Sequence, residues 1–183
     1  MSILTDEFPQ SLFISGQECP IKTDFKVWIK VSEIITKPEL TYKDMAKVFR
    51  LIFDDVPKNF FDAWNAILDF YSHEVKTKGN NNKKSFDFAH DADMIYSAFM
   101  QQYKIDLSDT RMHWWKFKAL FGGLSEDTHI VKAIQYRTID LSTIKDKEQK
   151  KFYKKMKSAY KLPDNRNEQQ KEEYINTVLE GMF

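Results

Sequence analysis

The sequence predicts a mainly α-helical protein: a multi-helix bundle with a short N-terminal β-hairpin. Apolar residues recur at helical spacing along most of its 183 residues, and only 5 Gly and 5 Pro interrupt the pattern. Hydrophobic residues make up 42% of the chain and aromatic residues 15%, which is enough to fill a core. Charged residues make up 30%, as expected where amphipathic helices keep one face in water.

Strand signals exceed helix signals only near the N-terminus, at residues 8–22. Short apolar runs at 11–14 and 19–22 flank a turn that contains Gly16, and two prolines oppose a helix there. This pattern predicts a two-stranded hairpin. Because two strands this short are marginally stable alone, we expect the hairpin to pack against another element.

Three helices are expected next. Residues 24–36 fit both a strand-like alternation and a helical stripe, and we favour a helix because Asp24 is a suitable N-cap. Thr41 and Asp44 form a capping-box pattern at the start of the second helix. The third helix is expected over residues 59–75, where six large apolar side chains follow helical spacing.

Residues 76–85 contain no large apolar side chain. Such a segment buries too little surface to offset the entropy lost on ordering. We therefore expect 77–85 to be a flexible linker or loop. It would separate residues 1–76, the hairpin plus helices, from residues 86–183, a C-terminal helical region. A true domain boundary and a long loop within one domain are equally good interpretations.

The C-terminal half predicts five further helices. The first spans about 87–103, and the second spans about 112–121 and ends at Gly122-Gly123, where one glycine is expected to form a left-handed cap. The other three helices are expected to begin at Ser125, at Thr143–Asp146 and at about residue 167, the last continuing to 181.

One group of acidic and histidine residues has the chemistry of a metal or acid–base site: His90, Asp91, Asp93, Asp106, His113 and His129. Zinc sites show tighter spacing and several soft ligands, and acids in a first helical turn are explained by the helix dipole. Cys19 has only Lys22 nearby to activate it, and no phosphate-binding or nucleophile motif is present. We therefore expect no enzyme activity, catalytic residue, cofactor or metal.

The charge balance and the cysteine content limit the compartment and the partners. Lys and Arg total 28 and Asp and Glu total 27, so there is no net field to steer the chain onto nucleic acid or anionic lipid. The single cysteine excludes an internal disulfide and fits a reducing compartment. No apolar run approaches the roughly 20 residues needed to cross a bilayer, and no secretory signal is recognisable. We expect a soluble intracellular protein.

The segment 145–161 is a candidate binding helix. Its lysines surround Phe152, Tyr153 and Met156, a pattern found in helices that bind nucleic acid or anionic membranes. The interpretation we favour is a lysine-rich face that packs beside the glutamate-rich final helix. The three apolar residues remain candidates for protein interaction.

Two adjacent tryptophans form a second candidate. Trp114 and Phe117 are three residues apart, so they share a helix face and are expected in the core. Trp115 points about 100° away from Trp114. Either this helix is central and covered on most sides, or Trp115 faces a partner, since tryptophan is enriched at interface hot spots. Trp115 is the candidate for a partner-facing residue on this helix.

Residues 88–141 carry a series of spaced motifs: Ile-Tyr-x-x-Phe, Tyr-x-Ile-Asp-Leu, His-Trp-x-x-Phe, Gly-Leu-x-x-Asp-Thr and Arg-x-x-Asp. The residues concerned are Ile95, Tyr96, Phe99, Tyr103, Ile105, Asp106, Leu107, His113, Trp114, Phe117, Leu124, Asp127, Thr128, Arg137 and Asp140. This series resembles the bacteriophage Gp-fifteen family of siphophage tail-module proteins. The sequence at 19–26 is similar to the family's passage from hairpin to helix.

The resemblance implies a phage protein that is encoded between the tail-tube and tape-measure genes. By that position it implies a tail assembly chaperone in the host cell cytoplasm, with the tape-measure protein and the tail-tube protein as partners and with self-association. No catalytic residue is carried over, and no membrane contact is implied. The alternatives are a structural tail component retained in the virion and a nucleic-acid-binding regulator that uses residues 145–161.

Overall fold

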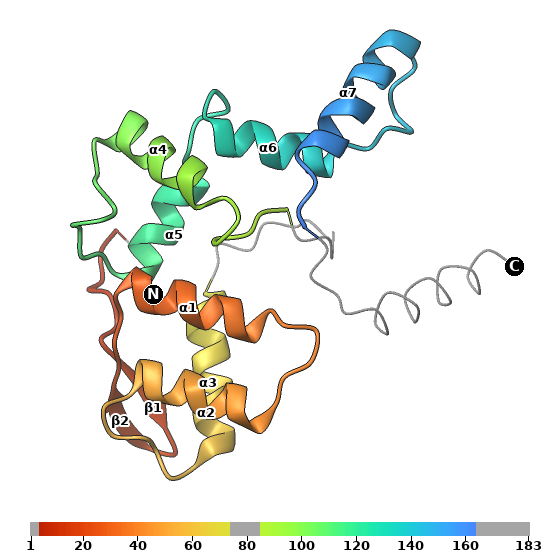
Figure 1. Cartoon of the computed structure of the whole chain (residues 1–183). Coiled ribbons are helices and arrows are strands. Elements are labelled where there is room, and N and C mark those ends of the chain that lie inside the picture. Colours follow the sequence, from red (N-terminus) through yellow and green to blue (C-terminus); the bar gives the residue numbers. More distant parts are fainter. Residues whose placement is uncertain (1–3, 74–84, 164–183) are drawn as a thin grey trace, which may run out of the picture. The chain divides into compact units, whose positions relative to one another are not determined.

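The computed structural model describes residues 4–73 and 85–163. Two strands and seven helices form in these ranges, which confirms the mainly α fold with an N-terminal hairpin (Figure 1). In chain order they are β1 (Ser11–Ile14), β2 (Gln17–Pro20), α1 (Phe25–Ile35), α2 (Tyr42–Ile52), α3 (Phe60–Ser72), α4 (Ala92–Tyr103), α5 (Trp114–Gly122), α6 (His129–Thr138) and α7 (Lys147–Ala159). The final helix expected over 167–181 lies outside the described residues.

The hairpin is antiparallel, with Ile14 opposite Gln17. Its two-residue turn has positive φ at Ser15 (50°) and Gly16 (81°), the conformation that matches the twist of the flanking strands and that glycine adopts at little cost. Leu12 and Ile14 on β1 are buried, and β1 packs against α3. The hairpin is therefore supported by a helix, as its small size requires.

The core of the first compact unit, which ends at Gln135, is built around aromatic side chains. Trp28 of α1 is fully buried, and its ring lies 4.5 Å from that of Phe70 on α3 and 6.4 Å from that of Trp114 on α5. Its indole N–H donates to the Lys22 carbonyl over 2.8 Å. These contacts join α1, α3 and α5 around one side chain, and α2 packs on α1 (Figure 1).

The passage into α1 is fastened to the passage into α5. The Phe25 amide donates to the Met112 carbonyl, and the Trp114 amide donates to the Thr23 carbonyl, each over 2.8 Å. The Asp24 carboxylate caps α1 by accepting from the Lys26 amide at 2.9 Å. Two segments almost 90 residues apart in the sequence are thus held side by side.

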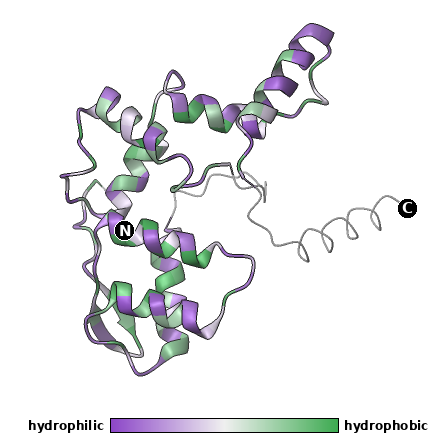
Figure 2. Cartoon of the chain, viewed as in Figure 1, coloured by the Kyte–Doolittle hydropathy of each residue, from purple (hydrophilic) through white to green (hydrophobic). Residues whose placement is uncertain are grey.

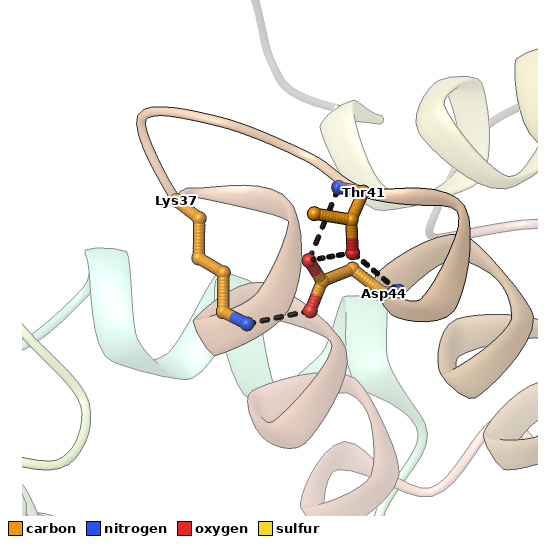
Figure 3. Close-up of polar contacts among 3 residues, drawn as sticks. All are labelled: Lys37, Thr41 and Asp44. Atoms are coloured by element: carbon orange, nitrogen blue, oxygen red, sulfur yellow. Dashed lines mark hydrogen bonds and ion pairs between the residues drawn. The ribbon is translucent and has the colours of Figure 1, made fainter.

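The corner between α1 and α2 contains the predicted capping box (Figure 3). The Thr41 hydroxyl accepts from the Asp44 amide, and the Asp44 carboxylate accepts from the Thr41 amide and hydroxyl. Lys37 donates to the other carboxylate oxygen. These hydrogen bonds, that from Lys37 above all, lower the pKa of Asp44 from 3.8 to about 2.

The chain forms two compact units, and the boundary between them along the sequence falls between Gln135 and Tyr136, so α6 begins in the first unit and ends in the second. Residues 77–84 lie outside the described residues, but rings from both sides of that segment, Phe70 and Trp115, pack together 5.1 Å apart. Whether 77–85 is a domain boundary or a loop stays a prediction.

Two helix starts differ from expectation. The helix expected from residue 87 begins at Ala92, because the buried Asp91 carboxylate turns back to accept from the Asp87 amide at 2.9 Å. The helix expected at Ser125 begins at His129, since the Ser125 carbonyl closes a turn by accepting from the Thr128 amide. Polar residues that resemble helix caps therefore form separate turns here.

The glycine cap expected after α5 is wrong in its conformation. Gly123 ends α5 with φ at −92°, and a side chain there would approach the Tyr103 hydroxyl to 3.2 Å. Close packing explains the glycine, not a left-handed turn. The left-handed cap occurs instead at Lys104, which ends α4 with φ at 56°.

We predict an acid-dependent contribution from Asp44. Its pKa is lower in the folded chain than its ordinary 3.8, so the charged carboxylate stabilises the fold above about pH 4, and this contribution is lost as the pH falls through about 2. Asp44→Asn should be less stable than the wild type at neutral pH, and the difference should shrink in acid. Urea unfolding between pH 7 and pH 2 measures it; a constant difference would contradict the assignment.

Candidate protein-interaction surfaces

The second unit presents the most exposed of the predicted binding residues on α7. Phe152 is 50% exposed, and Tyr153 and Met156 are half-buried. Tyr136 supports them from the end of α6, with its ring 6.5 Å from Phe152 and 6.3 Å from Tyr153. No residue of α7 is fully buried among the described residues, and the helix is predominantly hydrophilic (Figure 2). The structure thus places the three predicted residues together on a thinly covered helix.

The predicted core residues of α5 are confirmed. Trp114 and Phe117 are both buried, and their rings stack 5.8 Å apart. Phe117 also stacks on Phe25 of α1 at 4.8 Å and on Phe99 of α4 at 5.2 Å. One face of α5 therefore fills the space between α1 and α4.

The expectation that Trp115 faces a partner is wrong, because its side chain is only 9% exposed. Its indole N–H donates to the Phe70 carbonyl over 2.9 Å, and its ring stacks on His73 at 3.6 Å. The Trp114 indole and the Lys118 ammonium reach the Tyr71 carbonyl at 3.4 Å and 2.6 Å. These α5 donors satisfy carbonyls at the C-terminal end of α3, which lack partners within their own helix. Of the two alternatives, the centrally placed, covered helix is the observed one.

His113 is the N-cap of α5. Its Nδ1 accepts from the Trp115 amide at 3.1 Å, so the proton of the neutral ring is on Nε2, which donates to the Pro9 carbonyl at 2.9 Å. The ring stacks on Phe8 at 4.7 Å. Partial burial lowers the pKa of His113 below its ordinary 6.5, and the hydrogen bond to Pro9 opposes this shift.

One apolar groove and two exposed phenylalanines of the first unit were not predicted from the sequence. A groove of about 240 Å³ is lined mainly by Phe25, Ile29, Phe88, Ile95, Tyr96 and Phe117. Phe13 is 74% exposed and Phe61 is 75% exposed. Strand periodicity alone predicts the exposure of Phe13, because Phe13 alternates with the buried Leu12 and Ile14. The groove had no such signal, because it depends on how α1 and α4 pack.

The acidic and histidine residues considered as a metal site do not converge. No group of three potential metal ligands occurs in the ranges 4–73 and 85–163. Asp91 binds the backbone before α4, Asp106 accepts from the Ser108 amide at 2.8 Å, and His113 caps α5. Each of these three side chains has a structural partner. Within the same ranges no helix has the length and apolar run needed to span a membrane.

Comparison with known proteins identifies the family. The bacteriophage Gp15 protein family matches residues 4–162, which is most of the chain. The chain belongs to this family. No curated protein matches it, and no solved structure matches it. The match includes the hairpin and α7, both outside the stretch 88–141 that carries the most specific motifs.

The Gp15 motif residues are structural in this chain. Ile95 and Phe99 are buried, and the Tyr103 hydroxyl donates to the Leu120 carbonyl at 2.8 Å. Asp140 accepts from the Ser142 amide at 2.8 Å and Arg137 donates from Nε to the Tyr160 carbonyl at 2.5 Å. Tyr96 is the most exposed of the aromatic motif residues and lines the groove. These motif residues stabilise turns, helix ends and the core, and the exposed α7 residues are not among them.

Trp115→Ala is predicted to destabilise the fold about as much as Trp114→Ala, by roughly 3–5 kcal/mol, because each substitution leaves a cavity where a buried aromatic ring was. Trp115→Ala also leaves the Phe70 carbonyl without its indole donor. Phe61→Ala is the matched control, since that ring is mostly exposed. Urea unfolding measures all three, and a Trp115→Ala stability equal to that of Phe61→Ala would contradict the burial.

His113 is predicted to make stability depend on pH near neutrality. Protonation of Nδ1 removes the acceptor for the Trp115 amide. Because the pKa is lower in the folded chain than the ordinary 6.5, the stabilisation is complete well above pH 6.5 and declines as the pH falls below it. His113→Asn keeps a capping side chain that does not titrate. The stability of the wild type relative to His113→Asn, measured by urea unfolding from pH 8 to pH 5, should be lowest in acid.

Proposed function

We propose that this protein is a phage tail assembly chaperone that binds the tape-measure protein in the host cytoplasm and performs no chemistry. Membership of the bacteriophage Gp15 family supports a phage role. The second support is the kind of surface available: exposed aromatic residues on helices, with the motif residues committed to the fold. Tail-tube protein and further copies of the chain are the other partners proposed.

The exposed apolar side of α7 carries this proposal. Phe152, Met156 and Ala159 follow one another at i, i+4 and i+7, so they form one stripe along the helix. An amphipathic helix of a partner binds such a stripe through its own apolar face. The tape-measure protein is a long helical chain by the resemblance, so it offers many such faces. A stripe of this small area favours weak, reversible contacts, which a chaperone needs in order to release its client.

Phe152→Ala is predicted to weaken binding to the tape-measure protein by about ten-fold, or ~1.4 kcal/mol, since truncation of a central aromatic residue at an interface typically costs more than 1 kcal/mol. The stability of the Phe152→Ala variant should differ little from that of the wild type, because half of the Phe152 side chain is already exposed. Phe61→Ala provides the control, because Phe61 is a phenylalanine of the first unit that is even more exposed than Phe152. Titration calorimetry with a purified tape-measure fragment makes the comparison.

An equal loss of affinity in Phe152→Ala and Phe61→Ala would show that the tape-measure protein binds elsewhere on the chain. The composition of purified virions tests the chaperone role separately. We expect the protein to be absent from them, and its presence would favour a structural tail component. Submicromolar, salt-sensitive binding to DNA would favour the regulator alternative.

A further inference from the structure

The stripe on α7 also has a candidate occupant within the same chain. We propose that the acidic sequence of residues 168–183 binds the stripe formed by Phe152, Met156 and Ala159, with Lys151 and Lys155 as the charged edge of the contact. Residues 164–183 lie outside the described residues, so only their sequence supports this contact. The proposal concerns regulation of the site in the proposed function, but the contact itself does not depend on that function.

The charge on α7 is the first support. The helix contains six lysines and one glutamate. No ion pair involving α7 occurs among the residues that the structure describes. Lys155 lies three residues after Phe152 and shares its side of the helix, and Lys151 lies one turn before Lys155. An apolar stripe with a basic edge favours an acidic amphipathic partner over a basic one.

The sequence that follows α7 has this chemistry. Residues 164–183 contain five acidic and two basic residues. Their apolar residues Tyr174, Ile175, Val178, Leu179 and Met182 follow helical spacing, and Glu168, Glu172 and Glu173 precede or flank them. The apolar and charged sides therefore complement those of α7.

Position along the chain is the second support. The acidic sequence starts within ten residues of the end of α7, and Pro163 lies between them, where a helix does not continue. A short tether gives an effective concentration in the millimolar range. A tethered segment therefore occupies the stripe ahead of a dilute partner with similar contacts, and the tape-measure protein would have to displace it. This would keep the stripe covered until the client is present.

The test is disulfide cross-linking in the full chain with Cys19→Ser. Lys155→Cys lies on the side of the stripe, and Lys154→Cys lies at the same height on the opposite side. Each is paired with Lys171→Cys, which shares the predicted helix face of Tyr174 and Ile175. The two pairs change the charge equally and close loops of nearly equal length. The first pair also removes one lysine of the charged edge, which would slow its closure, so a faster disulfide in that pair reports the face of α7.

The pair with Lys155→Cys should form its intramolecular disulfide about ten-fold faster than the pair with Lys154→Cys under mild oxidation. Adding Phe152→Ala to the first pair should reduce its rate to that of the second. Equal rates for the two pairs would overturn the proposal, as would a disulfide that forms only between chains, which would assign the stripe to a second copy. Because no tape-measure protein is present, this result is independent of the binding test in the proposed function.

Discussion

The fold of the first unit depends on how the C-terminal end of α3 meets α5. The last carbonyls of α3 need donors, and α5 supplies the indole N–H groups of Trp114 and Trp115 and the Lys118 ammonium. Lys118 also places a positive charge at the negative end of the α3 dipole. Two tryptophans that point in different directions are thus satisfied by one neighbouring helix. This contact joins sequence on either side of residues 74–84 into a single core.

The capping histidine links that contact to the hairpin. His113 holds α5 through the Trp115 amide and holds the chain before β1 through the Pro9 carbonyl. The backbone bonds between residues 23–25 and 112–114 run beside it. These shared contacts join the sequence at 19–26 to the His-Trp motif, although about 90 residues separate them.

Function is proposed for a different part of the chain. In the first unit the motif residues are mostly buried or hydrogen-bonded within the unit, whereas α7 in the second unit has no fully buried residue among those described. A client-binding surface needs apolar side chains that the fold itself does not use. Phe152 meets this condition and Trp115 does not. A charged edge beside the stripe then limits the partners that fit it, including the chain's own acidic sequence.

The sequence by itself determined the helical class, the hairpin, the caps at Asp24 and Thr41, and the burial of Trp114 and Phe117. These features follow from local spacing and local hydrogen bonds, which the sequence displays directly. Only the tertiary structure decided the environment of Trp115, the placement of the unit boundary and the start of α4. The environment of Trp115 depends on the distant Phe70 carbonyl, and the unit boundary depends on a core shared by segments that are distant in sequence. The start of α4 depends on competition between two local hydrogen bonds, because the Asp91 carboxylate accepts from the Asp87 amide. Periodicity says which way a side chain points along its own helix, but not which other helix lies there.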